Sequence, residues 1–176
     1  MIPPVNRATQ TRVFLGQIPD GPAGTRVTLE LMTKMAREAR KSFPVRALAE
    51  RLVRSLPPKA YYAEINAIQN FVRDNIRYTK DIRGVETVAT PEKTLERRVG
   101  DCDDMSLLTA ALLESLGHRT RFVAIGNSRN NYCHVLVETQ ASDKRGRMRW
   151  VPVETTEPVN VGWYPKGYPF RMVRHV

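Results

Sequence analysis

The chain has 176 residues, a formal net charge of +10 and 26% charged residues, which predicts one globular domain with a single core. No apolar run approaches the roughly 18 residues of a membrane span. The first residues lack the charged and apolar regions of a secretory signal. The two cysteines, Cys102 and Cys133, exclude a disulfide-rich scaffold and fit a reducing compartment, so we expect a soluble protein made inside the cell.

The positive charge is unevenly distributed. Residues 1–60 carry 11 basic and 4 acidic side chains, residues 61–140 carry 10 and 11, and residues 141–176 carry 7 and 3. The basic flanks could contact nucleic acid or another polyanion through phosphate groups. No nucleic-acid-binding motif accompanies the charge, and a solvated helical surface in an arginine-rich chain is the simpler interpretation. Charge alone therefore identifies no partner.

The first third of the chain predicts an arm followed by helices. Residues 1–28 are rich in Pro, Gly and Thr, which is typical of an extended arm with turns. Apolar spacing predicts a helix from near Leu29, which Thr28 could cap, up to the interruption at Pro44. A basic helix is expected over about residues 45–54. A third, amphipathic helix is expected over residues 61–78, where the apolar side chains share one face.

The rest of the chain predicts two more helices and then strands. A short helix is expected from Pro91, with Thr90 as its cap. A strongly helical run follows over residues 102–116, capped by Asp101 and ended by Gly117. Strands are predicted over residues 120–125, 132–139 and 148–153, and residues 162–176 show no period. Helices first and strands afterwards predict an α+β fold, with the N-terminal helices packed on a small antiparallel sheet.

The segment around Cys102 carries the chemistry. With Asp101 as the N-cap, Cys102 lies in the first helical turn, where free backbone N–H groups and the helix dipole favour a thiolate. Asp103 and Asp104 lie in the same turn, Asp104 in a position like that of a capping box, and nearby carboxylates raise the pKa of a thiol. Activation of Cys102 as a nucleophile therefore needs an imidazole close to the sulfur.

His134 is the candidate for that imidazole. His118 follows a helix end and is most simply a solvated cation, and His175 is next to the last residue. His134 lies within a predicted strand, on the face opposite Cys133, where it can face the first turn of a packed helix. Glu154, at the end of the next strand, could orient the imidazole by accepting a ring N–H. By composition alone, the order cysteine, histidine, acid is a weak signal.

A metal site is the alternative to this arrangement. Its ligands would be Cys102, Cys133, His134 and His118. The chain has no Cys-x-x-Cys pair, and Cys133 and His134 point to opposite faces of one strand, so this alternative is disfavoured. A disulfide between Cys102 and Cys133 conflicts with His134 facing Cys102 for the same reason, so Cys133 is expected to be a packed thiol on the far face of the strand that carries His134. No cofactor and no metal are predicted.

The stretch over residues 61–158 resembles the transglutaminase-like cysteine protease superfamily, whose members share a papain-like core with the nucleophile at a helix N-terminus. The resemblance implies that Cys102 is the catalytic cysteine, His134 its histidine and Glu154 its acid. The acid of the family is usually Asp, and Glu, one methylene longer, can still orient an imidazole. The matching segments are Phe71–Tyr78, Pro91–Leu95, Arg98–Asp104, Leu112–Gly117, Thr120–Val123, Cys133–Val135 and Trp150–Thr156.

A closer likeness, which includes residues 18–25, is to short bacteriophage and prophage proteins. The resemblance implies a hydrolase or acyl transferase that acts on amide or isopeptide bonds of a protein or peptide through a thioester, in the bacterial host cytoplasm or the virion. The alternative is a structural or assembly component of the virion (tail, neck or capsid accessory) that retains the fold with little or no catalysis. Its arm and tail would then contact other phage structural proteins.

These expectations divide the chain into three parts. Residues 1–60 form the arm and the basic helices, residues 61–158 the transglutaminase-like catalytic core, and residues 159–176 a tail packed on the core or extending from it.

Overall fold

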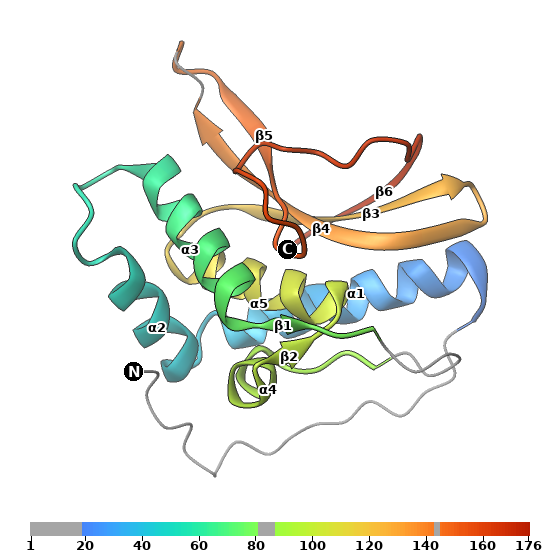
Figure 1. Cartoon of the computed structure of the whole chain (residues 1–176), viewed down its shortest axis with the longest axis horizontal. Helices are drawn as coiled ribbons and strands as arrows, with labels where there is room; N and C mark the ends of the chain where they lie inside the picture. The colour runs from blue at the N-terminus through green and yellow to red at the C-terminus, as the bar shows by residue number, and fades with distance from the viewer. Residues whose placement is uncertain (1–18, 81–86, 143–144) are drawn as a thin grey trace.

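The computed structural model describes residues 19–80, 87–142 and 145–176. Within these residues, five helices lie against one face of a four-stranded antiparallel sheet of order β5-β4-β3-β6, and a separate parallel pair joins β1 and β2 (Figure 1). The predicted α+β fold is confirmed. The elements are α1 Gly21–Ala39, α2 Phe43–Val53, α3 Tyr61–Asn75, β1 Arg77–Tyr78, α4 Pro91–Arg97, β2 Val99–Gly100, α5 Cys102–Ser115, β3 Thr120–Ser128, β4 Asn131–Ser142, β5 Met148–Val153 and β6 Phe170–His175.

Helix α1 begins earlier than the sequence predicts. The arm is expected to extend to residue 28, but α1 starts at Gly21, with Asp20 at the N-cap position. Pro22 lies in the first turn, where its missing N–H costs no hydrogen bond and its fixed φ suits a helix. Thr28, the expected cap, is a buried residue in the middle of α1. The part of the predicted arm over residues 1–18 lies outside the described residues.

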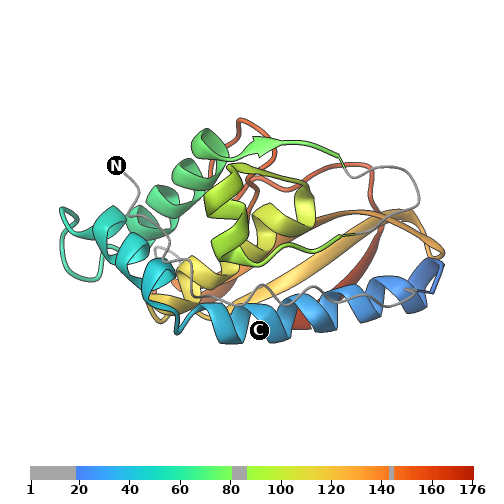
Figure 2. The ribbon, with the colours of Figure 1, turned by 90° about the horizontal axis from the view of Figure 1, so that it is seen from below.

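Helix α5 is the centre of the fold. Its residues from Asp104 to Leu113 are all buried, which is the behaviour of a helix enclosed on every side. Helices α1, α2, α3 and α4 contact it on one side and strands β3 and β4 on the other, and the view from below shows the helices wrapped around it (Figure 2). The packing of these elements around α5 therefore fixes the position at which the helix begins.

Helix α3 ends at Asn75, three residues before the predicted end. Ile76 adopts an extended backbone, and Arg77 and Tyr78 pair in parallel with Val99 and Gly100. Ile76 is buried although its backbone is extended. The apolar spacing of the helix therefore continues past the residue at which the helix ends. As a result, β1 lies beside the two residues that lead into Asp101 and Cys102.

The sheet is larger than the three predicted strands. Strand β5 has the predicted bounds. Strand β3 ends later than predicted, at Ser128, and β4 both begins earlier, at Asn131, and ends later, at Ser142. The register shifts on either side of Gly126, where a Cβ would collide with the carbonyl oxygen of Asn131, so the bulge requires glycine. Strand β6, which pairs with β3, was not predicted. Four of its six residues are exposed, so it carries no clear alternation of apolar side chains.

The two faces of the sheet have different covers. The face toward the helices belongs to the main core, which includes Phe122, Val135 and Val137. The opposite face carries a small cluster of Val123, Ile125 and Leu136, against which Tyr164 and Tyr168 of the C-terminal segment pack. No helix in the described part of the chain has the length and apolar character needed to cross a bilayer. The three-part division of the chain stays a prediction.

Candidate active site

Cys102 is the first residue of α5, and a capping interaction fixes this end of the helix. Asp101 has an extended backbone, and its Oδ1 accepts the N–H groups of Asp103 and Asp104, both at 3.0 Å. The carboxylate of Asp104 accepts the N–H of Ala89 at 2.7 Å. A Cβ at Gly100 would come within 2.7 Å of the Asp104 Cβ, so glycine lets the chain enter the helix this closely. The predicted cap at Asp101 is confirmed.

The sulfur of Cys102 lies at an edge of strand β4. Strand β5 pairs with β4 only as far as Val137, so Val135 lies beyond the last pair. The thiol of Cys102 donates to Asp103 Oδ1 at 3.7 Å. At this edge the start of α5 takes the place of a strand: the Val135 carbonyl accepts the hydroxyl of Ser106 at 3.1 Å, and the Val135 backbone lies close enough to Cys102 to lower the pKa of its thiol. Because Val135 follows His134, this contact brings Cys102 next to the predicted histidine.

His134 and Glu154 form a hydrogen-bonded pair. The imidazole Nε2 lies 2.7 Å from Glu154 Oε2. The Glu154 side chain is almost fully buried, and its Oε1 accepts both the N–H and the hydroxyl of Thr156 at 2.7 Å. The amide of Gln69 on α3 donates to the Glu154 carbonyl at 2.6 Å. Both oxygens of the carboxylate and its backbone are therefore held in place.

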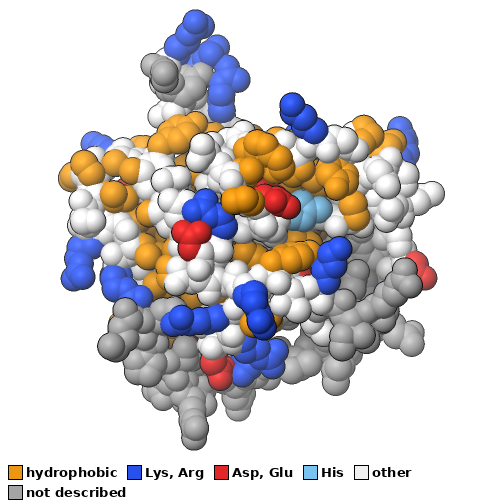
Figure 3. Space-filling view, in the orientation of Figure 1, with side chains coloured by type: hydrophobic (Ala, Val, Ile, Leu, Met, Phe, Trp, Pro, Cys, Tyr) orange, Lys and Arg blue, Asp and Glu red, His pale blue; other side chains and the backbone are white. Residues whose placement is uncertain are grey.

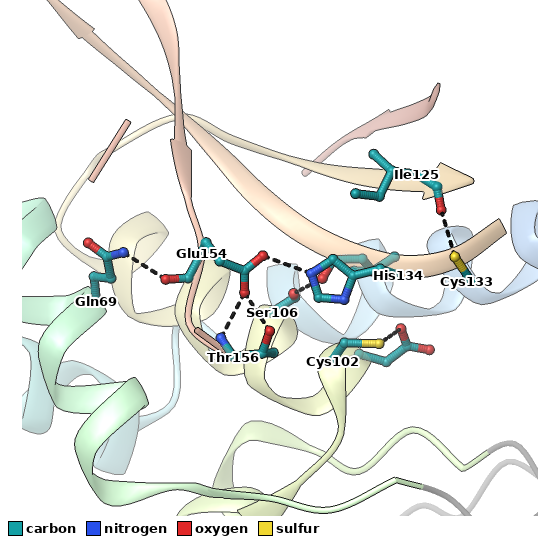
Figure 4. Close-up of polar contacts among 10 residues, drawn as sticks. Gln69, Cys102, Ser106, Ile125, Cys133, His134, Glu154 and Thr156 are labelled. Atoms are coloured by element: carbon teal, nitrogen blue, oxygen red, sulfur yellow. Dashed lines mark hydrogen bonds and ion pairs between the residues drawn. The ribbon is translucent and has the colours of Figure 1, made fainter. Parts of the chain in front are cut away.

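The three predicted site residues come together from three elements. In Figure 4 the imidazole of His134 lies over Cys102, with Nε2 toward Glu154 and the other ring nitrogen on the side of the sulfur. Cys102 comes from the start of α5, His134 from β4, and Glu154 from the residue after β5. A ring nitrogen on the side of the thiol is available to take its proton, while the carboxylate holds the ring orientation.

The surroundings of Cys102 oppose ionisation of the free thiol. Burial is the largest effect, and the charges of Asp103 and Asp101 add to it, so the pKa of the Cys102 thiol is raised well above its usual range. The hydrogen bond from the Val135 backbone lowers this pKa, but by less. The neutral thiol is therefore the favoured form of the free residue, chiefly because of burial.

Glu154 and Tyr78 keep opposite protonation states. Burial raises the pKa of Glu154. Hydrogen bonding and charge from His134, together with the two hydrogen bonds from Thr156, lower it by more, so the pKa lies below its usual value and the carboxylate is ionised at neutral pH. Burial and the charges of Cys102, Asp101, Asp103 and Glu154 raise the pKa of Tyr78 to about 12. Its phenol therefore keeps its proton at neutral pH and can donate a hydrogen bond.

Four residues of the site were not identified from the sequence as functional. They are Gln69, Tyr78, Ser106 and Thr156. Tyr78 falls within a segment that resembles the family, but nothing in a single sequence assigns it a role. Gln69 and Ser106 are polar residues fully or almost fully buried in helices. A polar residue on an otherwise apolar helix face is the one signal that could have found them.

The remaining candidates lie elsewhere. The prediction that Cys133 is a packed thiol is wrong, because the residue is exposed at the end of the hairpin. The prediction of a solvated His118 is also wrong: it is buried, and its Nε2 lies 2.7 Å from Glu64 Oε2. His175 packs edge-on against Trp150. No group of three or more metal-ligating side chains occurs among the described residues.

The surface on this side of the molecule is mixed. In Figure 3 an imidazole reaches the surface beside an acidic side chain, with hydrophobic side chains around it and Lys and Arg side chains further out. The side chain of His134 is 17% exposed, so the histidine of the site has limited access to solvent.

Fold and site together define a class of protein. It is an α+β protein in which a cysteine begins a buried central helix and a histidine lies on an adjacent antiparallel sheet. The profile of the Transglutaminase-like superfamily matches residues 46–155. The chain therefore belongs to the Transglutaminase-like superfamily.

A solved structure supports the same fold, and a second gives a weaker match. A candidate protease from Parabacteroides distasonis matches with a TM-score of 0.54 and 12% identity over 70% of this chain and 26% of that protein. A candidate cysteine protease from Cytophaga hutchinsonii matches with a TM-score of 0.49 and 15% identity over 74% of this chain and 45% of that protein. This chain thus spans less than half of either. No curated protein matches the sequence. None of these findings supports a phage origin, which stays a prediction.

Proposed function

We propose that the chain is a cysteine-dependent hydrolase or acyl transferase acting on amide or isopeptide bonds of a protein or peptide. Cys102 is the nucleophile, His134 the general base and acid, and Glu154 the group that orients the imidazole. The observation that carries the proposal is the 2.7 Å bond between His134 and a buried, ionised Glu154, formed beside the thiol of Cys102.

The first half-reaction forms a thioester. His134 takes the proton of the Cys102 thiol as the sulfur attacks the carbonyl carbon, and the tetrahedral intermediate collapses with loss of the amine, which receives that proton. Because burial and the charges of Asp103 and Asp101 raise the pKa of Cys102, the thiolate forms only with a base beside it, and His134 supplies that base. The N–H of Cys102 itself, at the start of α5, is placed to donate to the developing oxyanion.

The second half-reaction regenerates the thiol. His134 removes a proton from water or from an amine, which attacks the thioester carbonyl, and the sulfur leaves and is protonated. Water gives a carboxylic acid, and an amine gives a new amide. Membership of the superfamily supports both outcomes, and the solved structures support the hydrolytic one by name only.

The test uses p-nitrophenyl acetate as an activated acyl donor, in a Cys133→Ala background so that one thiol remains. We expect a burst of nitrophenolate and an acetylated protein detectable by intact mass, and both should be lost in Cys102→Ala. Release of the acetyl group in water alone and with added glycine ethyl ester then separates hydrolysis from aminolysis.

Two outcomes would contradict the proposal. One is acetylation that persists in Cys102→Ala, and the other is a parent protein that acetylates no faster than that variant. The second outcome is what the alternative predicts, in which the fold serves as a virion component with little or no catalysis. His134→Gln should reduce the burst rate by at least 100-fold. Its midpoint of urea unfolding should shift no more than is usual when a buried polar side chain is replaced.

A further inference from the structure

We propose that Ser106 is a positioning residue of the active site: it ties helix α5 to the uncovered edge of strand β4 and so sets the separation between Cys102 and His134. The catalytic consequence rests on the proposed function, but the tie itself is a structural statement that can be tested separately.

The edge of β4 is the first part of the argument. The N–H and C=O of one residue in an antiparallel strand point to the same side. Strand β5 ends its pairing at Val137, so both groups of Val135 point to the place where the next β5 residues would lie. Helix α5 fills that place: the Ser106 hydroxyl donates to the Val135 carbonyl at 3.1 Å, and Cys102 lies one turn earlier, close to the Val135 backbone.

The spacing on α5 is the second part. Residues four apart on a helix lie on one face, one turn above the other, so Cys102 lies on the same face of α5 as Ser106, whose hydroxyl donates to β4 (both residues are labelled in Figure 4). Ser106 is 2% exposed and Val135 is 6% exposed. Loss of the hydroxyl would leave the Val135 carbonyl buried without this partner, and an unsatisfied buried acceptor favours a local shift of strand against helix.

Such a shift acts directly on the catalytic pair. His134 precedes Val135 in β4, and Cys102 lies one turn before Ser106 in α5, so sliding at this contact changes the distance from the thiol to the imidazole. Reaction rates depend steeply on this kind of placement, and a displacement of about 1 Å can cost about 100-fold. Ser106 itself touches neither the substrate nor the reacting atoms in this arrangement.

The experiment compares two buried hydroxyls on α5. Ser106→Ala removes the hydroxyl that bonds β4. Thr109→Val removes one that is equally buried but donates to Met105 O of its own helix at 2.7 Å. In the Cys133→Ala background we expect Ser106→Ala to reduce the burst rate with p-nitrophenyl acetate at least 10-fold. Thr109→Val should stay within twofold at a similar loss of stability, and Ser106→Thr, which keeps the hydroxyl, should recover most of the rate.

Equal burst rates in Ser106→Ala and Thr109→Val would overturn the proposal. A direct measurement follows the Val135 amide by ¹⁵N–¹H NMR. Ser106→Ala should move this resonance and speed its hydrogen exchange, while Thr109→Val should do neither. A Val135 amide that responds no more to Ser106→Ala than to Thr109→Val would also overturn the proposal. If the parent shows no burst, the proposed function fails, and the NMR result alone decides the role of Ser106. If Ser106→Ala does not fold, Ser106→Cys, which keeps the side-chain size and weakens the donor, takes its place in both measurements.

Discussion

At Cys102, effects of opposite sign act on one sulfur atom. The helix N-terminus and the hydrogen bond from Val135 favour the thiolate, while burial and the charges of Asp103 and Asp101 favour the thiol, and the thiol is favoured overall. The proposed mechanism therefore starts from a thiol rather than from a reactive thiolate. The nucleophile forms when the imidazole accepts the proton, which limits side reactions with other electrophiles.

Asp103 is the acidic side chain with the largest charge effect on this thiol. We expect Asp103→Asn to lower the pKa of Cys102, because removing a neighbouring negative charge stabilises the thiolate. The midpoint of the pH profile for iodoacetamide alkylation should move to lower pH by about 1 unit. The measurement follows the single thiol of a Cys133→Ala protein by intact mass across the pH range.

Glu50→Gln is the control for this change, because it removes an exposed carboxylate on α2, paired with Arg46. It should leave the midpoint in place. A profile that does not move in Asp103→Asn, or that moves to higher pH, would show that the charge of Asp103 does not reach the sulfur.

Among the elements, the start of α5 connects stability to the site. Asp101 caps this helix with two hydrogen bonds, and the capped turn holds Cys102. We expect Asp101→Ala to reduce the free energy of unfolding by about 1 kcal/mol and to reduce the burst rate with p-nitrophenyl acetate, because the first turn frays. Asp101→Ser keeps a capping oxygen and should recover most of both quantities, as measured by urea unfolding and stopped-flow absorbance.

Thr90 provides the matched control. It caps α4 through a hydrogen bond from the N–H of Lys93, but α4 carries no site residue. Thr90→Ala should cost a comparable free energy of unfolding and leave the burst rate unchanged. If both cap variants slow the burst equally, global stability rather than the position of Cys102 controls it.

The elements also show how far sequence reasoning reaches. The cap at Asp101, the helix that follows and the strand over residues 148–153 could be predicted, because caps and apolar periodicity are local signals. The early start of α1 could not be predicted because the sequence from Pro19 to Pro22 fits a turn as well as the start of a helix. The helix packs against α5, and a single sequence does not show that contact. Strand β6 was missed because an exposed edge strand needs no alternation.

The site shows the same limit. The order Cys102, His134, Glu154 was a weak signal until a resemblance to a family supplied the roles. The hydroxyl of Ser106 donates to the carbonyl of a residue 29 positions further along the chain, and no local sequence pattern predicts such a contact. His118 was misjudged because its partner, Glu64, lies 54 residues earlier, so burial there depends on how α3 packs against the end of α5.

Across the whole molecule, two histidine–glutamate pairs have the same geometry and different surroundings. His134 and Glu154 lie beside a thiol, while His118 and Glu64 join the end of α5 to the start of α3, next to the ring of Tyr61. Each pair has a nitrogen–oxygen distance of 2.7 Å. The second pair therefore offers an internal reference for what such a contact contributes when no chemistry depends on it.

We expect His118→Gln to reduce the free energy of unfolding by about 1–3 kcal/mol, because it leaves a partly buried carboxylate with a weaker partner. The burst rate with p-nitrophenyl acetate should stay within about twofold of the parent at temperatures where the variant is folded. His134→Gln should lose the burst, because the imidazole that takes the thiol proton is gone, while its loss of stability should be similar, because it also leaves a buried carboxylate with a weaker partner. Urea unfolding and the burst assay on both proteins check this, and a burst reduced equally by both substitutions would mean that the two pairs do not separate structure from catalysis.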